Sequence, residues 1–465
     1  MTEQTLVFDR ELIRRYDRQG PRYTSYPTAV QFNDGYGVTQ YYQHARITNE
    51  EQKPAPLSLY FHIPFCATVC FYCACNKVVT KNQAHTVRYL DCLFLEIEKQ
   101  GGLFDKSRKV EQLHWGGGTP TFLNKLQMGR LMDVTRSHFH LSDDGEGEYS
   151  IEIDPRTVDP DRIVFLRDLG FNRLSLGVQD FDPTVQKAVN RIQSEEQTLS
   201  IIDAARQAGF KSVSLDLIYG LPFQSVDSFD KTLTRVIEAS PDRISVFNYA
   251  HLPHLFKTQR QIDESALPLP EEKLRIFRHA IERLSYAGYV YIGMDHFAKP
   301  LDELAVAQRE GKLSRNFQGY ATHGDCDIVG MGVSAIGRIG NSYSQNERDL
   351  EQYQKRMENG DLAVFRGVEL TWDDVLRRDV INQLICHFEL QMEIYETRYG
   401  INFWEYFAVE AEQLAKMQED GLLAIEHGRL RVLPAGRLLI RNICMVFDLY
   451  LNSQADDKVR FSKVI

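Results

Sequence analysis

Six short apolar runs, each followed by a helical pattern, constrain the fold of this chain more than any other feature. The helical patterns place apolar residues three and four positions apart, as in Val87, Leu90, Phe94 and Ile97. Strands that alternate with helices in this way predict a parallel sheet covered by crossover helices. Periodicity does not decide whether the sheet stays open or closes into a barrel. The predicted strands are residues 57–63, 110–115, 149–153, 173–178, 212–219 and 243–247.

The cysteines are concentrated in one loop. Of eight cysteines, four lie within residues 66–75 with the spacing C-x3-C-x2-C-x-C, just after the first predicted strand. Zinc usually takes two separated pairs of ligands, whereas thiolates on one loop suit one side of a cubane iron–sulfur cluster. We therefore expect a cluster, with zinc as the alternative, and three thiolates would leave one iron open to a ligand. Spacing alone does not choose three ligands among Cys66, Cys70, Cys73 and Cys75.

Glycines and polar residues follow several of the predicted strands. Residues 116–120 (Gly-Gly-Gly-Thr-Pro) come after the second strand, and consecutive glycines let the backbone approach a ligand closely. Glu152, Gln179 and Asp216 lie in or just beyond the next three strands, and Arg191 lies after the fourth. Ligands bind at the carboxyl ends of parallel strands, so we expect these residues to converge on one site.

The two ends of the chain depart from the strand–helix pattern. Residues 1–55 read as a polar arm, with a short helical start at 10–18 and irregular backbone around Pro21 and Pro27. The C-terminal part predicts helices, a short hairpin and a long helix from Pro434, an order that resembles a winged helix. In an acidic chain we favour a packing module or a substrate lid over DNA binding. The predicted elements are helices 373–388 and 403–418 and strands 422–425 and 430–433.

Charge and hydropathy exclude several classes of protein. The 465 residues carry 54 basic and 64 acidic side chains, a net charge of −10, so no global basic field exists to hold nucleic acid or an anionic membrane. The first twenty residues lack the apolar segment of a secretory signal, and no apolar run approaches the length of a membrane-spanning helix. Residues 330–335 imitate a dinucleotide fingerprint, but no βαβ unit surrounds them. We therefore expect a soluble, cytoplasmic protein.

The isolated cysteines are expected to be ordinary buried residues: Cys92, Cys326, Cys386 and Cys444.

The cysteine loop and several other segments resemble a known family. The spacing C-x3-C-x2-C, with Tyr72 immediately before the third cysteine, resembles the radical S-adenosylmethionine (SAM) superfamily. The additional Cys75 and the arm segment 21–28 narrow the resemblance to the oxygen-independent coproporphyrinogen III oxidases, and it extends along nearly the whole chain. Further segments that carry it are 114–120, 150–155, 173–181, 216–222, 247–253, 294–297, 316–320 and 441–447.

This resemblance implies a fold and a set of site residues. The fold is α/β, an incomplete (β/α)6 radical-SAM barrel with an N-terminal arm and a mainly helical, winged-helix-like C-terminal domain. The implied domains are the arm at 1–55, the barrel with its [4Fe–4S] cluster at 56–300, a connecting extension at 301–365 and the helical domain at 366–465. Cys66, Cys70 and Cys73 are implied as cluster ligands, and Cys75 belongs to the motif without binding iron. The family binds two SAM molecules, without an implied division of residues between them, and the implied contacts are Tyr60, Tyr72, Gly117, Gly118, Thr119, Glu152, Gln179, Arg191, Asp216, Ala250 and Ile336.

The resemblance also implies a reaction. It is the anaerobic oxidative decarboxylation of two propionate side chains of coproporphyrinogen III to vinyl groups, which gives protoporphyrinogen IX in haem biosynthesis. Cluster and SAM carry the chemistry through a 5′-deoxyadenosyl radical, so no protein acid or base is expected. The expected partners are this substrate and an unidentified electron donor and acceptor, with no nucleic acid, no membrane and a monomeric state.

Two other functions remain as alternatives. One is a haem chaperone of the same superfamily, which Cys75 and the arm segment 21–28 disfavour because such chaperones typically lack both. The weaker one is a winged-helix regulator that senses redox state through its cluster. Stable haem binding without decarboxylation would favour the chaperone, and specific DNA binding the regulator.

Overall fold

The computed structural model describes residues 6–142 and 145–452, which form two compact units. Unit 1 combines three segments of the chain, residues 1–31, 284–324 and 370–465. Unit 2 combines residues 32–283 and 325–369. Residues 1–5 of the predicted arm and 453–465 of the predicted C-terminal domain lie outside the described residues.

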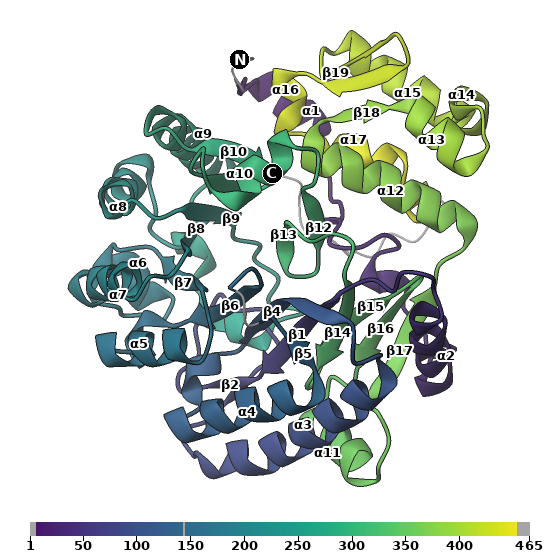
Figure 1. Ribbon diagram of the computed structural model, residues 1–465. Coiled ribbons are helices and arrows are strands. Elements are labelled where there is room, and N and C mark those ends of the chain that lie inside the picture. The colour runs from purple at the N-terminus through teal and green to yellow at the C-terminus, as the bar shows by residue number, and fades with distance from the viewer. Residues whose placement is uncertain (1–5, 143–144, 453–465) are drawn as a thin grey trace. The chain divides into compact units, whose positions relative to one another are not determined.

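Unit 2 is built on a sheet that contains all six strands predicted between residues 57 and 247. Within this unit the strands run in the order β9-β8-β7-β6-β4-β1-β14-β15-β16-β17. Pairing is parallel from β9 through to β14, and antiparallel from β14 to β17. The six predicted strands form the incomplete (β/α)6 barrel that the family resemblance implied (Figure 1), and β14 adds a seventh parallel strand beside β1. The predicted strands are β1 (Leu57–Ile63), β4 (Lys109–Gly117), β6 (Glu148–Ile153), β7 (Arg173–Gln179), β8 (Ser212–Tyr219) and β9 (Arg243–Asn248).

Helices cover the outside of the parallel strands (Figure 1). The helix α8 shows why these segments are helical. The side chain of Ser225 accepts a hydrogen bond from the Ser228 amide at its N-cap, and Phe229, Leu233 and Val236 form a buried stripe at helical spacing. The helices of unit 2 are α2 (Val38–Asn49), α3 (Ala84–Leu103), α4 (Lys125–His138), α5 (Pro160–Asp168), α6 (Pro183–Ala188), α7 (Glu195–Gln207), α8 (Val226–Ala239), α9 (Pro270–Tyr286) and α11 (Leu350–Glu358).

Several elements of unit 2 were absent from the sequence prediction. The expected polar arm contains α2, whose buried residues Tyr41, Ala45 and Thr48 lie four and three positions apart. The expected connecting extension supplies a central strand, β14, which pairs with β1. The remaining strands of the unit are β2 (Phe65–Cys66), β3 (Val78–Val79), β5 (His140–Leu141), β14 (Asp327–Met331), β15 (Ile336–Ile339), β16 (Ser342–Asn346) and β17 (Val364–Glu369).

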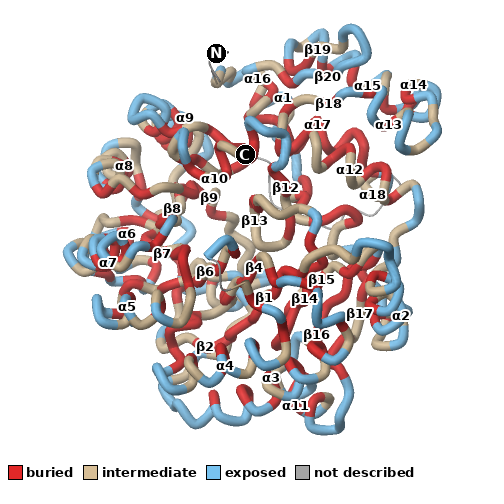
Figure 2. Tube along the Cα trace, in the orientation of Figure 1, coloured by how far each residue is buried: buried red, intermediate tan, exposed pale blue. Residues whose placement is uncertain are grey.

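The core of unit 2 lies along the central strands. Leu59, Phe61 and Trp115 are fully buried on β1 and β4, as expected for parallel strands that are covered on both faces. Figure 2 shows these strands as buried and the outer faces of α3 and α4 as exposed. The isolated cysteines Cys92 and Cys326 are buried and free, as predicted.

Unit 1 joins short strands and helices from both ends of the chain and from residues 284–324. Its sheets are the pair β10–β11, the hairpin β12–β13 and the three-stranded wing in the order β18-β20-β19. The strands are β10 (Val290–Gly293), β11 (His296–Ala298), β12 (Ser314–Asn316), β13 (Gly319–Ala321), β18 (Glu389–Gln391), β19 (Leu423–Glu426) and β20 (Arg429–Val432). The helices are α1 (Arg10–Tyr16), α10 (Glu303–Arg309), α12 (Trp372–His387), α13 (Met392–Tyr399), α14 (Phe403–Tyr406), α15 (Ala408–Glu419), α16 (Pro434–Arg437), α17 (Ile440–Val446) and α18 (Leu449–Asn452).

Two helix predictions in unit 1 are wrong. The predicted long helix from Pro434 is three short helices, because the chain turns at Leu439 and because Asp448 caps a new helix by accepting bonds from the amides of Tyr450 and Leu451. The predicted helix 403–418 breaks at Phe407, whose backbone leaves the helical conformation while its ring is fully buried. Packing of these large apolar side chains decides the breaks, and periodicity does not contain that information.

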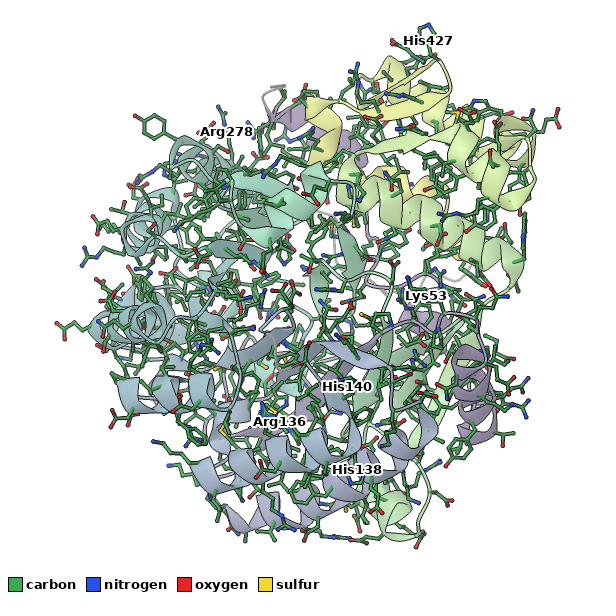
Figure 3. The ribbon with its side chains drawn as sticks, in the orientation of Figure 1. Lys53, Arg136, His138, His140, Arg278 and His427 are labelled. Atoms are coloured by element: carbon green, nitrogen blue, oxygen red, sulfur yellow. The ribbon has the colours of Figure 1, made fainter. Side chains whose placement is uncertain are left out.

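Charged side chains lie mainly on the surface of each unit. Figure 3 shows His427 at the tip of the wing hairpin and Arg278 on α9 pointing outward. Within the described residues, no helix has the length and apolar content that crossing a membrane requires.

Candidate functional site

One cavity of unit 2, of about 270 Å³, collects most of the predicted site residues. It lies at the carboxyl ends of the parallel strands, where ligands bind in α/β folds. The four clustered cysteines line it together with Thr68 and Lys77. Its other lining residues are Tyr72, Gly117, Gly118, Thr119, Glu152, Ile153, Asp154, Arg156, Ser175, Gly177, Gln179, Arg191, Asp216, Ile218 and Phe247.

The cysteine loop is held by contacts at its start and at its centre. At its start, β2 pairs in parallel with β3, which brings the chain before and after the loop together. At its centre, the Phe71 amide donates to the Val189 carbonyl at 3.0 Å, and the Asn190 side chain donates to the Val69 carbonyl at 2.7 Å. These contacts fix the loop before any ligand is bound.

A second set of contacts comes from the segment after β9. Gln259 is buried, and its amide nitrogen donates to the carbonyls of Tyr72 and Ala250 at 3.1 and 3.2 Å. Thr258 donates to the Cys73 carbonyl at 3.1 Å. Ala250 does not line the cavity, but the Gln259 amide connects its carbonyl to the carbonyl of Tyr72 in the cysteine loop.

Three of the cysteines differ in their acid–base environments. Burial raises the pKa of the Cys66 thiol to about 11, although Thr119 donates a hydrogen bond to its sulfur at 3.5 Å. A hydrogen bond from Cys75 lowers the pKa of Cys73 to about 6, aided by the positive charge of Lys77. The same hydrogen bond, with burial, raises the pKa of Cys75 well above its usual value. The structure thus favours Cys73 as the thiolate of this pair and Cys75 as its donor.

Two arginines reach the sulfur of Cys70. Arg156 Nη2 and Arg191 Nη1 lie 3.5 and 3.4 Å from Cys70 Sγ. Asp154 forms ion pairs with both, at 2.7 Å to Arg156 and 3.4 Å to Arg191. Burial alone would raise the pKa of Asp154, but the hydrogen bond from Arg156 and the charge of Arg191 hold it below its usual value. The positive charge of two guanidinium groups therefore lies beside this sulfur.

The glycine turn places backbone against the cysteine loop. The amides of Gly118 and Thr119 donate to the carbonyls of Ile63 and Phe65 at 2.8 Å each. A side chain at Gly117 or Gly118 would collide with the His62 ring or with the backbone of Ile63 and Pro64. The Gly117 φ of +109° also lies in the region that glycine alone adopts readily. The consecutive glycines are therefore required by this close approach.

Glu152 and Asp216 face the cavity with different ionisation tendencies. Glu152 accepts from the Gly117 amide at 3.0 Å and lies 3.4 Å from His114. Burial raises its pKa, but these partners outweigh that effect and hold the pKa below its usual value. Asp216 accepts from Ser175 at 2.9 Å, and burial raises its pKa to about 6.

The ends of other strands complete the lining. At the end of β7 the pairing with β8 shifts register between Gly177 and Gln179, and Gln179 takes a φ of +69°. Arg191 Nη2 donates to the Gly177 carbonyl at 2.6 Å, while its buried Nε atom has no hydrogen-bond partner within the described part of the chain. Such an unpartnered charged donor fits a site that takes a polar ligand.

Two further predicted residues, Tyr60 and Ile336, lie outside the cavity lining. The Tyr60 ring stacks on His114, with centroids 5.8 Å apart, and His114 in turn contacts Glu152. Tyr60 is thus linked to Glu152 through the His114 ring. Ile336 begins β15, and its carbonyl closely faces Gly330 in the neighbouring strand β14. Gly330 serves this strand packing, whereas a side chain at Gly332 would collide with the Tyr89 hydroxyl and the His62 backbone. Both glycines therefore have structural roles, which accounts for the resemblance of this segment to a dinucleotide fingerprint.

Several lining residues were missed by the sequence prediction. Arg156, Asp154 and Ser175 follow or lie in strands whose other polar residues were identified. Arg156 comes directly after the segment 150–155 that carried the family resemblance, and a search one turn beyond each strand end would have found it. Lys77 follows the last clustered cysteine and donates to the Cys73 carbonyl at 3.1 Å.

The cysteines are not arranged around a single ion. In residues 6–142 and 145–452, no three histidine, cysteine or carboxylate side chains converge as ligands of one metal ion would. A cubane cluster gives each thiolate its own iron, so its ligands line one side of a cavity without meeting at a point. The placement of the clustered cysteines along one cavity is compatible with such a cluster.

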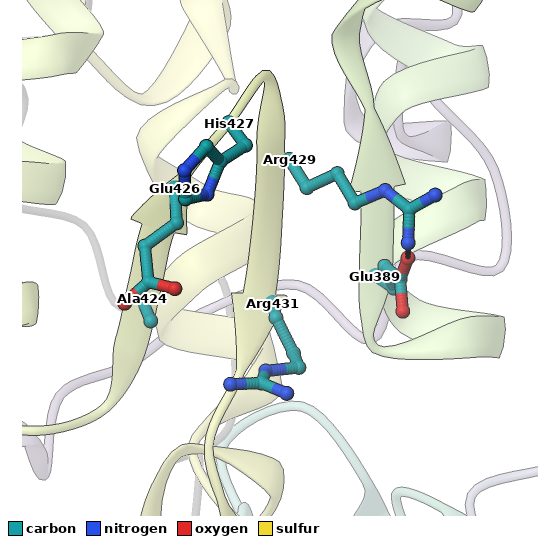
Figure 4. A pocket seen from close by; sticks show the side chains of 6 residues that line it. All are labelled: Glu389, Ala424, Glu426, His427, Arg429 and Arg431. Carbon is teal, nitrogen blue, oxygen red and sulfur yellow. Dashed lines mark hydrogen bonds and ion pairs between the residues drawn. The ribbon is translucent and has the colours of Figure 1, made fainter.

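A second cavity, of about 300 Å³, lies on the wing of unit 1 (Figure 4). Arg429 and Glu389 form an ion pair across it at 3.5 Å, and His427, Arg429 and Arg431 are exposed. Its lining mixes both signs of charge and contains no buried polar group aimed into it, so its residues read as a solvated surface.

Two family models match the chain. Residues 60–236 match the radical SAM superfamily, and residues 370–439 match the HemN C-terminal domain.

Relatives match over its whole length. An oxygen-independent coproporphyrinogen III oxidase from Pseudomonas aeruginosa is 54% identical over 461 residues, covering 99% of both chains. The enzyme of the same name from Escherichia coli K12 is 50% identical over 465 residues and covers 100% of both. A solved structure, described as coproporphyrinogen III oxidase (HemN) from Escherichia coli, a radical SAM enzyme, matches with a TM-score of 0.91 and 49% identity, over 96% of this chain and 100% of that one.

Proposed function

Since this chain belongs to the oxygen-independent coproporphyrinogen III oxidase family of radical SAM enzymes, we propose that the cavity of unit 2 is the site of its cluster and SAM. The chain is an enzyme of haem biosynthesis that oxidatively decarboxylates two propionates of coproporphyrinogen III to vinyl groups. The observation that carries the proposed site is that the cysteines, the glycine turn and the strand-end carboxylates line the same cavity.

The thiols of Cys66, Cys70 and Cys73 are the proposed ligands of a [4Fe–4S] cluster. Their chemistry fits, because soft thiolates suit iron and all three line one cavity. The lowered pKa of Cys73 favours its thiolate, and the guanidinium groups of Arg156 and Arg191 lie beside the Cys70 sulfur. Cys75 acts as a hydrogen-bond donor to Cys73 and does not bind iron.

The proposed SAM contacts divide by chemistry. Glu152 and Asp216 suit an ammonium group or a ribose diol, and Arg191 suits a carboxylate. The glycine turn at Gly117 and Gly118 offers backbone groups at close range. Two SAM molecules are proposed, with further contacts from Tyr60, Tyr72, Thr119, Gln179, Ala250 and Ile336.

The protein's own part in the reaction is to hold these groups and exclude water. When bound, the cluster and SAM supply the electron and the radical that begin the decarboxylation. The backbone contacts of the cysteine loop, together with Thr258 and Gln259, hold the loop in one conformation. No side chain is required as an acid or base, since hydrogen-atom abstraction needs none.

Partners and location complete the proposal. We propose a monomer in the cytoplasm that takes electrons from an unidentified donor, passes them to an unidentified acceptor and binds neither nucleic acid nor membrane. The free state of all eight cysteines fits a reducing compartment.

Serine substitutions test the cluster assignment. Cys66→Ser, Cys70→Ser and Cys73→Ser should each remove the visible iron–sulfur absorption and all SAM cleavage, because thiolate ligation holds the cluster. Cys75→Ser, on the same loop, is the matched control, and it should keep the bound iron while turnover of coproporphyrinogen III falls. Iron content, absorption and product chromatography are measured under anaerobic conditions with dithionite as reductant. Iron loss in Cys75→Ser as complete as in the other variants would contradict the assignment.

A further inference from the structure

Unit 1 contains a group of arginines that outnumbers the carboxylates beside it. Arg22, Arg315 and Arg441 lie within electrostatic reach of one another, and Asp295 is the carboxylate that faces them. Asp295 lies between β10 and β11 and pairs with Arg22 at 2.8 Å. Burial, together with the positive charges of Arg22 and Arg315, lowers the pKa of Arg441 to about 10, although the charge of Asp295 acts against this. The group therefore carries excess positive charge in a partly buried place.

Arg315 is held in a fixed orientation. Its guanidinium carbon lies 4.7 Å from the centroid of the Tyr320 ring, and Tyr320 is buried and donates to the Ile385 carbonyl at 3.0 Å. Its Nε atom donates to the Arg22 carbonyl at 3.3 Å. The Nη1 atom is buried and has no hydrogen-bond partner among residues 6–142 and 145–452. A buried charged donor without an acceptor is costly, so the structure leaves this atom ready for an anion.

Arg22 is fixed from the other side by the arm. Arg441 is buried, and its guanidinium donates to the carbonyls of Gly20 and Pro21, which immediately precede Arg22. Arg22 uses its Nη1 atom for Asp295, and about a third of its side chain, 34%, is exposed. Arg22 is thus positioned firmly and accessible to a small ligand.

We propose that Arg22 and Arg315 form a carboxylate-binding subsite that takes one propionate of the substrate. A guanidinium presents a planar fork of donors that matches a carboxylate, and two forks can hold both of its oxygens. The subsite rests on the proposed function, because the substrate of that reaction, coproporphyrinogen III, carries four propionate side chains. Because the protein carries a net charge of −10, a tetra-anionic substrate needs such a local positive group. Arg441 serves as a positioning residue that holds the arm.

Binding of coproporphyrin III, the oxidised and unreactive relative of the substrate, tests the subsite. Its fluorescence is followed on titration of the cluster-loaded protein, and its tetramethyl ester, which lacks the negative charges, serves as the comparison ligand. Arg315→Gln and Arg22→Gln should each weaken binding of the acid about 10–100-fold, the range for a lost charge-assisted contact. Binding of the ester should be weak and should change little.

Arg429→Gln on the wing is the matched control. It removes the same charge from the same unit at an exposed position, and it should leave binding unchanged. Arg315→Lys keeps the charge without the fork and should recover only part of the affinity. SAM affinity and iron content report on unit 2 and should match the wild type in every variant.

The substitution Asp295→Asn should change the affinity for coproporphyrin III in the opposite direction. It removes a carboxylate that competes for Arg22, so binding of coproporphyrin III should become tighter. Wild-type affinity in both Arg22→Gln and Arg315→Gln would overturn the subsite alone. A wild-type protein that neither binds coproporphyrin III nor converts coproporphyrinogen III would overturn the proposed function as well.

Discussion

The two carboxylates of the cavity differ in the pH range in which they are charged. Asp216 has a pKa raised to about 6 by burial, whereas the partners of Glu152 hold its pKa below the usual range. If both bind SAM as carboxylates, only Asp216 makes SAM binding depend on pH near neutrality. The sign follows directly, because protonation below pH 6 removes the charge and weakens binding.

Asp216→Asn and Glu152→Gln test this difference. Each should weaken SAM binding about 10–150-fold, the loss of one charge-assisted contact of roughly 1.5–3 kcal/mol. The wild type and Glu152→Gln should both lose affinity as pH falls from 7 to 5.5, and Asp216→Asn should show a flat profile over that range. Equilibrium SAM binding at constant iron content is the measurement. Unchanged affinity in both variants would remove these carboxylates from the site.

At the scale of elements, the network around Glu96 on α3 connects the helix to the strands β14 and β16. Glu96 is fully buried and accepts hydrogen bonds from the Gly332 amide, the Asn346 side chain and the Tyr353 hydroxyl, each at 2.7 Å. Burial raises its pKa from 4.5 to about 7, although these donors lower it. Tyr89, on the same helix, donates to the His62 carbonyl, so the network reaches the strand before the cysteine loop.

This pKa makes the stability of unit 2 depend on pH. Between pH 4.5 and 7 the folded protein holds a proton that the unfolded chain releases, so the free energy of unfolding falls as pH rises and levels off above 7. The ceiling of this effect is about 3 kcal/mol. Glu96→Gln should flatten the change between pH 5 and 8 in thermal unfolding. Glu98→Gln, at an exposed position of α3, should follow the wild type. A Glu96→Gln profile as steep as the wild type would show that Glu96 does not titrate.

The six strands between residues 57 and 248 were predictable from the sequence because each is a short segment rich in apolar residues that lies between helical patterns. β1 and β8 begin and end at the predicted residues. β14 was missed because its sequence includes Asp327 and Gly330, which no strand pattern favours; its pairing with β1 and β15 makes it a strand. The helix α2 was missed because its buried stripe relies on Ala45 and Thr48, which carry a weak hydrophobic signal.

The cavity was partly predictable for a related reason. The order of strands and the rule on their carboxyl ends were sufficient to bring Glu152, Gln179 and Asp216 together. The contacts of Arg156 with Cys70 and of Gln259 with Tyr72 cross large distances in the chain. Such contacts depend on how loops pack, and periodicity says nothing about them.

At the scale of the whole molecule, unit 1 depends on the first residues of the chain. Tyr23 is buried and donates to Asp448 at 2.8 Å, and the buried Tyr26 hydroxyl accepts from the Leu449 amide at 3.1 Å. Arg441 is buried against the carbonyls of Gly20 and Pro21. Residues 6–31 of the arm are therefore an integral part of unit 1. The expectation of irregular backbone around Pro21 holds, but this stretch is packed into the unit and is not a loose tail.

Deletion of residues 1–28 should therefore destabilise unit 1 and leave the cluster and SAM site of unit 2 unchanged. Unit 1 would lose two buried tyrosines, at roughly 3–5 kcal/mol each by analogy with large core truncations, and Arg441 would be left buried with fewer acceptors. The cysteine loop takes its described contacts from unit 2, so cluster content and SAM binding should persist. Vinyl formation should be abolished, and limited proteolysis with mass spectrometry should cut first within 284–324 or 370–452.

Two point variants distinguish the effect of the deletion on substrate binding from its effect on the stability of unit 1. Arg22→Gln removes the proposed propionate contact but none of the buried tyrosines, so it should weaken substrate binding at an unchanged melting temperature. Tyr23→Phe removes one buried hydroxyl and leaves Asp448 with one donor fewer, so it should lower the unfolding free energy of unit 1 by about 1–3 kcal/mol with substrate affinity retained. The deletion should combine both effects. A truncated enzyme that makes protoporphyrinogen IX at the full-length rate would show that the arm serves neither the fold of unit 1 nor the substrate.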